Sequence, residues 1–233
     1  MLEVKDVNSF YGKAHVLNDL NFRVDAGTVV ALLGRNGAGK TTTMKSIMQL
    51  VKPRSGTVTY KSQDITGWPS HKVARDGLGY VPEERRIFTQ LTVLENLEVG
   101  RQPPRDGSTT WTEAMVFDLF PNLAERRNNL GKALSGGEQQ MLTIARTLMG
   151  NPAFILLDEP SEGIAPVIVE QMARVILQLK SEGLTVLLSE QNLHFAQAVA
   201  DGVVIIEHGT QKYVGSLSEL QAHPEIRDQY LSV

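Results

Sequence analysis

Apolar and polar residues alternate along the first part of the chain. Residues Leu2–Val7 and Val16–Val24 follow the period of two that is typical of strands with one buried face. The next run, Thr28–Leu33, is almost wholly apolar, as in a strand that is buried on both faces. Between the first two strands, Tyr11 and Gly12 are predicted to lie in a polar loop. The pattern predicts an antiparallel β part at the N-terminal side, followed by a central sheet strand.

Beyond this point the pattern alternates between helices and strands, which predicts an α/β fold with a mostly parallel sheet. Helices are predicted at Thr41–Leu50, Pro69–Asp76, Thr92–Val99, Thr112–Phe120, from Leu134 to about Met149, Pro166–Ser181, Asn192–Ala200 and near Ser216–Gln221. Further strands are predicted at Thr57–Tyr60, Gln63–Ile65, Leu78–Val81, Phe154–Asp158, Leu184–Ser189, Val203–Ile206 and Thr210–Val214.

These elements are predicted to form a single domain that spans residues 1–233. Approximately residues 84–150 are predicted to be a helical lobe inserted into the α/β core, with an exposed break at 102–108. A polar tail is predicted to follow the helix near residue 221.

Composition narrows the class of protein. Apolar content of 42% and charged content of 21% are ordinary for a globular domain, and the net charge of −3 disfavours nucleic acid as a partner. The absence of Cys excludes disulfides and thiol chemistry. No apolar run approaches the ~18 residues of a membrane span, and the first ten residues lack the apolar core of a signal peptide. Any membrane role is therefore expected to come through a partner.

The segment Gly34–Thr41 matches the phosphate-binding pattern G-x-x-x-x-G-K-[ST] at every fixed position, between a predicted strand and a predicted helix. Its glycines let backbone N–H groups point at phosphate oxygens, Lys40 is expected to reach the β- and γ-phosphates, and the Thr41 hydroxyl to ligate Mg²⁺. A chance glycine-rich turn is the alternative, and an eight-residue match in this context argues against it. The candidate ATP-binding residues are Tyr11, as a ring that can stack on adenine, and Gly34, Arg35, Asn36, Gly37, Ala38, Gly39, Lys40, Thr41 and Thr42.

Two further motifs carry candidate chemistry. The strand Phe154–Asp158 ends in the acids Asp158 and Glu159, of which the first is expected to hold Mg²⁺ and the second to act as general base on water. A solvated acidic turn is the alternative, and the complete phosphate loop in the same chain disfavours it. Leu134-Ser135-Gly136-Gly137-Glu138 opens a helix whose N-terminus is suited to a second phosphate contact.

The order and spacing of these three motifs resemble the ATP-binding subunit of ABC transporters over nearly the full chain. The resemblance implies a P-loop NTPase core that hydrolyses ATP with Mg²⁺, and Tyr11 as the residue that stacks on adenine. It also implies head-to-tail pairing of two cassettes. ATP would lie between the phosphate loop of one cassette and Leu134, Ser135, Gly136, Gly137 and Glu138 of the other.

Other stretches resemble the LivF-type cassettes of branched-chain amino-acid importers. These stretches are Gly79-Tyr80-Val81-Pro82-Glu83, Arg85-Arg86-Ile87-Phe88, Asp158 to Pro166 and Ser189-Glu190-Gln191-Asn192. The resemblance implies a LivG-like second cassette, or a second copy of this chain, together with two integral membrane permease subunits and an extracytoplasmic binding protein. It places the chain on the cytoplasmic face of the plasma membrane, where the helical lobe and the loop around residues 83–88 would touch the permease.

Three alternatives to this function remain open. The first is the same role in an importer of urea or short amides. The second is a soluble ABC ATPase that acts on ribosomes or DNA, which usually carries two cassettes or a long coiled-coil insertion. The third is a nucleotide-dependent regulator without turnover, which the acids Asp158 and Glu159 disfavour.

Three positions depart from the common ABC pattern. Glu83 replaces a Gln that can touch Mg²⁺ and the attacking water, Gln191 replaces a His, and Ala165 replaces an Asp. We therefore expect a catalytic set of Glu159, Gln191 and Glu83 and a metal set of Thr41, Asp158 and Glu83. We also expect the site on this chain's own phosphate loop to hydrolyse ATP more slowly than the sister site.

Overall fold

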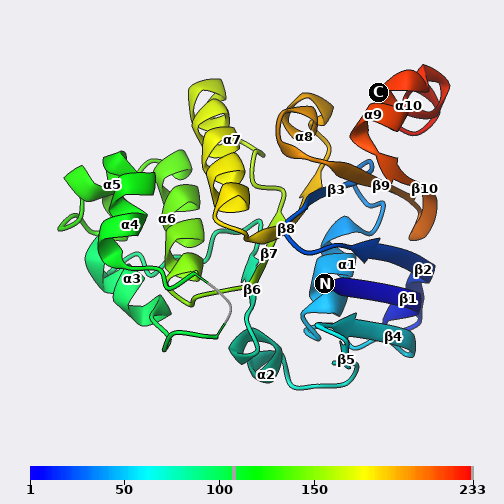
Figure 1. Cartoon of the computed structure of the whole chain (residues 1–233), viewed down its shortest axis with the longest axis horizontal. Helices are drawn as coiled ribbons and strands as arrows, with labels where there is room; N and C mark the ends of the chain where they lie inside the picture. The colour runs from blue at the N-terminus through cyan, green and yellow to red at the C-terminus, as the bar shows by residue number, and fades with distance from the viewer. Residues whose placement is uncertain (107–108, 232–233) are drawn as a thin grey trace.

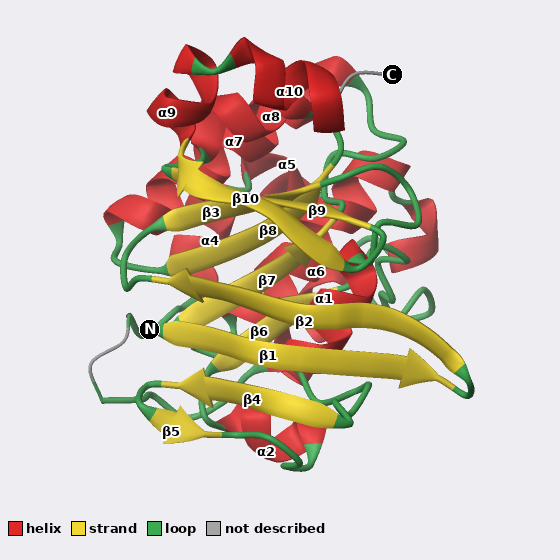
Figure 2. Cartoon of the chain, turned by 90° about the vertical axis from the view of Figure 1, so that its right-hand side faces the viewer, coloured by secondary structure: helices red, strands yellow, loops and turns green. Residues whose placement is uncertain are grey.

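The computed structural model describes residues 1–106 and 109–231, which form two sheets with helices packed around them (Figure 1). The smaller sheet is antiparallel, in the order β2-β1-β4-β5, and Figure 2 shows it face on. Its strands are β1 Leu2–Tyr11, β2 Ala14–Val24, β4 Ser55–Tyr60 and β5 Gln63–Asp64. The predicted antiparallel part at the N-terminal side is confirmed.

The larger sheet has the order β10-β9-β3-β8-β7-β6, and every neighbouring pair is parallel except β9 with β10. Its strands are β3 Val29–Leu33, β6 Leu78–Val81, β7 Phe154–Asp158, β8 Thr185–Glu190, β9 Gly202–Glu207 and β10 Thr210–Ser216. In β3, β7 and β8 every residue is buried, because both faces of the sheet are covered. The predicted mostly parallel sheet is confirmed.

Alternate residues of β3 enter two separate cores. Val30 and Leu32 pack with the inner face of the smaller sheet and with α1, Lys40–Ile47, which lies between the two sheets. Val29 and Leu33 pack with the helices on the opposite face. The other helices are α2 Ser70–Arg75, α3 Val93–Gly100, α4 Glu113–Leu119, α5 Pro121–Glu125, α6 Gly136–Leu148, α7 Pro166–Ser181, α8 Leu193–Val199, α9 Leu217–Ala222 and α10 Pro224–Tyr230.

The regular elements between residues 84 and 150 are α3 to α6 and a short 3₁₀ turn at Gly131–Ala133. They lie together at the left of Figure 1, and the treatment of this segment as an inserted lobe stays a prediction. Of the predicted break at 102–108, residues 107 and 108 lie outside the described residues. None of the described helices combines the length and hydrophobicity that a membrane span requires.

The structure corrects two predictions at the ends of elements. Tyr11 is the last residue of β1 and pairs with Ala14, because Gly12 adopts φ 59° and permits a tight turn to β2. The polar tail contains α10, which begins at Pro224, a residue suited to the first helical turn. Ile226 is among the partly buried residues through which α10 packs on the core.

Asn96 in α3 fixes the chain just before that helix. Its side chain is fully buried, donates to the carbonyls of Phe88, Leu91 and Thr92, and accepts from the Phe88 N–H at 2.9 Å. These contacts hold residues 88–92 in the conformation that leads into the N-cap Thr92.

Asn96→Ala is expected to lower the free energy of unfolding by about 2 kcal/mol, because it leaves several buried backbone groups without a partner. Thermal or urea unfolding measures the loss. The control is Asn129→Ala in the same helical segment, where the side chain is exposed. Equal stabilities of the two variants would contradict the role assigned to Asn96.

Candidate functional site

The phosphate loop joins β3 to the N-terminus of α1. Gly39 precedes the helix with φ 111°, and no side chain among the described residues caps the N–H groups of this end. A Cβ atom added to Gly34 would lie 2.4 Å from the Ile206 carbonyl oxygen, so the loop needs glycine at that position. Free N–H groups at a helix N-terminus attract anions, as a phosphate site requires.

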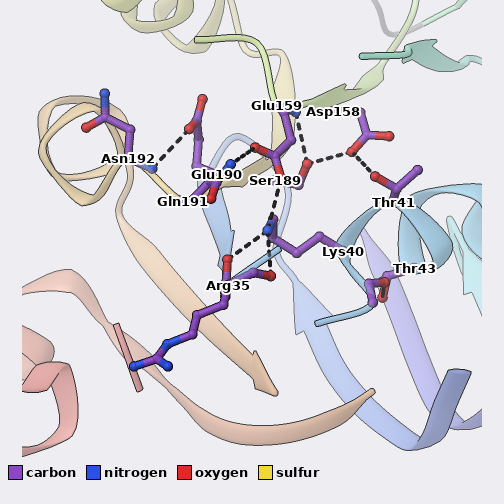
Figure 3. Close-up of polar contacts among 12 residues, drawn as sticks. Arg35, Lys40, Thr41, Thr43, Asp158, Glu159, Ser189, Glu190, Gln191 and Asn192 are labelled. Atoms are coloured by element: carbon purple, nitrogen blue, oxygen red, sulfur yellow. Dashed lines mark hydrogen bonds and ion pairs between the residues drawn. The ribbon is translucent and has the colours of Figure 1, made fainter. Parts of the chain in front are cut away.

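Lys40 is buried at this helix start and makes three contacts. Its ammonium donates to the carbonyl of Gly34 at 2.7 Å and to that of Arg35 at 3.1 Å. It also forms a 3.0 Å ion pair with Glu159 Oε1, with both side chains buried (Figure 3). A buried ion pair loses the hydration of both charges and relies on additional hydrogen bonds of this kind.

A cavity of about 270 Å³ opens over the phosphate loop. It is lined by Asn36, Gly37, Gly39, Lys40, Thr41, Glu83, Glu159 and Glu162. The structure thus brings together much of the predicted phosphate loop, the predicted base and the predicted switch residue Glu83. None of the predicted signature residues, Leu134 to Glu138, is among these described lining residues, and their role stays a prediction.

Asp158 ends β7, is fully buried and contacts Thr41, one of the residues that line this cavity. Its Oδ1 accepts the hydroxyl of Ser189 at 2.7 Å and that of Thr41 at 3.1 Å, and its Oδ2 accepts the Tyr80 hydroxyl at 2.9 Å. Burial raises the pKa of Asp158, and the three hydroxyl donors oppose this effect because they favour the ionised form.

Glu159 follows Asp158 with φ 49°, which is uncommon for a residue other than glycine. Its N–H donates to the Ser189 carbonyl at 3.1 Å and the Ser189 hydroxyl at 3.0 Å, which holds this conformation. The carboxylate then contacts Lys40 through Oε1 and accepts from Gln191 Nε2 at 3.2 Å through Oε2. Backbone strain retained at one residue is frequent at functional sites.

Glu190 joins two loops behind Glu159. This side chain is 1% exposed, and its two oxygens accept the N–H groups of Ser161 at 3.1 Å and Asn192 at 3.3 Å. Burial raises the pKa of Glu190 to about 7, against the opposing effect of these hydrogen bonds. Glu190 therefore connects the loop after β7 with the loop after β8, which carries Gln191.

The predicted signature residues lie at the start of α6. Ser135 is the N-cap and exchanges hydrogen bonds with Glu138, whose carboxylate also pairs with Arg126 at 2.9 Å. Ser135 is exposed, and a Cβ atom on Gly137 would lie 2.9 Å from Ile168, so that position favours glycine. A contact of this helix start with a second nucleotide stays a prediction.

The donor chemistry of the predicted metal set fits Mg²⁺. Thr41 and Asp158 offer oxygens 3.1 Å apart, and the Glu83 carboxylate lines the same cavity as Thr41. Among the described residues, no group of three or more His, Cys, Asp or Glu side chains makes a metal site from protein alone. In nucleotide enzymes Mg²⁺ is usually bound by one or two protein groups together with phosphates and water, so two or three oxygen donors suffice.

The other predicted residues lie around this centre. Tyr11 is 48% exposed at the end of β1, and Ala38 and Thr42 are buried in the loop and in α1. Arg35 and Ala165 are exposed. The roles assigned to these residues stay predictions.

Three residues of the site were not found from the sequence: Tyr80, Ser189 and Glu190. Their partners in the site, Asp158 and Ser161, lie far away in the sequence, on a neighbouring strand or in the loop that follows it. The available signal was weak: Ser189 and Glu190 are polar residues at the end of an apolar run, which is where ligands collect in parallel sheets.

This arrangement defines a P-loop nucleotide-binding enzyme, with a phosphate loop after β3 and an acidic pair at the end of β7, a parallel strand that β8 separates from β3. The family model described as ABC transporter matches residues 17–162. The chain belongs to this family, as an ATP-binding subunit and an ATPase.

Similar proteins cover the chain almost completely. The branched-chain amino acid transport ATP-binding protein BraG of Pseudomonas aeruginosa is 40% identical over 231 residues, which cover 99% of each chain. The lipopolysaccharide export ATP-binding protein LptB of Escherichia coli is 35% identical over 232 residues, which cover 99% of this chain and 96% of LptB. A dimeric ATP-binding cassette solved with ADP and Pi has a TM-score of 0.80 and 25% identity, covering 93% of this chain and 99% of that one.

A change at Glu190 is expected to alter the pH dependence of stability. The folded-state pKa of about 7 lies above the ordinary value of 4.5, so between these values the folded chain holds more protons than the unfolded chain. The contribution of Glu190 to stability is therefore greatest at low pH and falls as the pH rises toward 7.

Glu190→Gln removes this titration. From about pH 5 to about pH 8, the melting temperature of the unchanged chain is expected to fall relative to that of the variant. Thermal unfolding at a series of pH values checks this, with Glu170→Gln on the exposed face of α7 as control. Parallel curves for the unchanged chain and Glu190→Gln would show that Glu190 does not titrate in this range.

Proposed function

We propose that this chain is the ATP-hydrolysing subunit of an ABC importer for branched-chain amino acids. The observation that carries the choice of cargo is the 40% identity to BraG over 99% of both chains. The similarity to LptB is lower, at 35%, and supports a second candidate, a subunit of a lipopolysaccharide exporter. Both candidates use the same ATP site and differ in their membrane partners.

For the chemistry, we propose that binding of ATP rearranges the Lys40–Glu159 pair. Lys40 would turn from Glu159 Oε1 toward the β- and γ-phosphates, and the freed Glu159 carboxylate would then accept a proton from the attacking water. Gln191, which donates to Glu159 Oε2, would keep that carboxylate oriented. Before ATP arrives, the ion pair with Lys40 holds the base in an unreactive contact.

Mg²⁺ bound with the nucleotide would neutralise charge that develops on the phosphates. Thr41 and Asp158 are its proposed protein ligands, with Glu83 as a further oxygen donor. Ser189 holds the Asp158 carboxylate and the Glu159 backbone together.

We also propose that a permease subunit docks in a second cavity, of about 590 Å³, next to the helical segment. Leu50, Phe88 and Val99 line it and are large apolar side chains that are about half exposed. Arg146 also lines it, with Nη1 buried and without a hydrogen-bond partner among the described residues. An apolar rim around an unpaired guanidinium N–H fits a helix that presents apolar side chains and a carbonyl or carboxylate oxygen.

The importer function is tested by reconstitution with the permease subunits and binding protein of a BraG-type system. ATPase activity is expected to rise when the binding protein is loaded with leucine, isoleucine or valine. Val99→Asp is expected to abolish co-purification with the permease, whereas Val214→Asp, an exposed valine on β10, is expected to retain it. Assembly with lipopolysaccharide-export subunits in place of the importer subunits would favour the second candidate.

We further propose that the site on this chain's phosphate loop is the slower one of an asymmetric pair. Glu83, Glu159 and Glu162 line its cavity together, and the charge of Glu159 is one cause that raises the pKa of Glu162, after burial. An ionised Glu83 adds negative charge near the γ-phosphate and cannot donate a hydrogen bond there.

Glu159→Gln in this chain is expected to retain much of the ATPase activity of a complex with a second, different cassette. The equivalent change in the partner is expected to lower turnover ~10²–10³-fold. Phosphate release from both complexes measures the contrast, with Glu170→Gln on the exposed face of α7 as a control. If the change in this chain alone abolishes turnover, the asymmetry has the opposite sense.

A further inference from the structure

Tyr80 lines the docking cavity and also hydrogen-bonds to Asp158, a proposed ligand of Mg²⁺. It lies in β6, where it pairs with Leu156 of β7, two residues before Asp158. Its hydroxyl donates to Asp158 Oδ2 at 2.9 Å, while Tyr80 also lines the 590 Å³ cavity proposed for docking. One partly buried side chain therefore links the docking cavity to the proposed metal ligand without any intervening residue.

The hydrogen bond from Tyr80 determines how Asp158 presents its oxygens. Oδ1 faces the hydroxyls of Thr41 and Ser189, and Oδ2 is held from the opposite side by Tyr80. Hydrogen bonds at both oxygens prevent the carboxylate from rotating, so Oδ1 stays directed at Thr41. Burial raises the pKa of the Tyr80 hydroxyl, which therefore remains a proton donor at neutral pH.

The tyrosine has little freedom to move without changing this bond. Its ring is anchored on an edge strand whose neighbour β7 carries Asp158 itself. A small tilt of the ring by a group that enters the docking cavity would move the hydroxyl relative to Oδ2, since strand and carboxylate are fixed by the sheet. Hydrogen bonds weaken steeply with such changes in distance and angle.

We propose that Tyr80 is a positioning residue that transmits occupancy of the docking cavity to Asp158, and thereby sets the affinity of the ATP site for Mg²⁺. The relay rests on the proposed docking surface, whereas the positioning of Asp158 by Tyr80 does not. The two parts are therefore tested separately, the first in a complex and the second on the full chain by itself.

Tyr80→Phe removes the hydroxyl and keeps the ring. Binding of a fluorescent ATP analogue to the full chain is measured in EDTA and over a series of Mg²⁺ concentrations. In EDTA, the affinity of the variant for the ATP analogue is expected to match that of the unchanged chain. The Mg²⁺ concentration at which half of the Mg²⁺-dependent increase in affinity is reached is expected to rise about tenfold. An unchanged Mg²⁺ response would overturn the positioning role.

The matched control is Tyr60→Phe. Tyr60 is also buried and also donates one hydrogen bond, from its hydroxyl to the Gly77 carbonyl at 3.2 Å, away from Asp158. Its Mg²⁺ response is expected to equal that of the unchanged chain. Thermal unfolding of both variants separates a loss of stability from a loss of Mg²⁺ affinity, and an equal Mg²⁺ defect in both would contradict a specific role of Tyr80.

The relay is tested in the complex with the permease subunits. Assembly is expected to shift the Mg²⁺ half-saturation of nucleotide binding in the unchanged chain and to leave it unshifted in Tyr80→Phe. Ser189 also donates a hydrogen bond to Asp158, but it is fully buried and does not line the docking cavity. Ser189→Ala is therefore expected to weaken Mg²⁺ binding and to retain the shift on assembly. A shift that persists in Tyr80→Phe would overturn the relay. Failure of the complex to form would count against the docking surface, and the measurements on the full chain would still decide the positioning role.

Discussion

The parallel register of β3, β7 and β8 is the constraint on which the ATP site depends. Leu33 pairs with Glu190 and Asp158 with Ser189, so the three strands end level with one another. Because the carboxyl ends of parallel strands meet at one edge, residues more than a hundred positions apart, such as Thr41 and Asp158, come within hydrogen-bond distance. A shift of one residue in β7 would point Asp158 to the opposite face, and the same shift in β8 would do so for Ser189.

The same edge concentrates buried ionisable groups, which are satisfied by one ion pair and by hydrogen bonds. Lys40 and Glu159 neutralise each other, while Asp158 and Glu190 are held by hydroxyl and N–H donors. Replacing such groups with apolar residues commonly stabilises a protein, so their presence is better explained by chemistry than by stability. The pair Lys40–Glu159 in particular is an arrangement that a polyanionic ligand can displace, since the ligand supplies the negative charge that Lys40 would lose.

The sequence was most informative where one continuous segment contains both the secondary structure and the candidate functional residues. The phosphate loop needs a strand, glycines and a helix in succession, and all lie within Thr28–Leu50. Tyr80 and Glu190 were missed because their partners Asp158 and Ser161 belong to another strand or loop. The pattern of apolar and polar residues within one segment does not reveal which strands lie side by side. The ends of elements were missed for a similar reason.

Tyr11 extends β1 because β2 returns beside it, and α10 forms because the core offers a surface to Ile226. In both places a tertiary contact stabilises a segment whose local sequence is polar. By contrast, the short apolar strands β7 and β8 were predicted within a residue or two, because burial on both faces leaves a continuous apolar run.

The charges around the ATP cavity support the proposed pairing with a second cassette. Of the eight residues that line the cavity, Lys40 is cationic, and Glu83, Glu159 and Glu162 are anionic. A nucleoside triphosphate adds further negative charge, so the cavity by itself is electrostatically unfavourable apart from Lys40 and the N-terminus of α1. A divalent cation and a second helix N-terminus, such as the exposed start of α6 in another cassette, would supply the missing positive charge. This need for positive charge supports the proposed head-to-tail pairing, in which two cassettes would close on ATP.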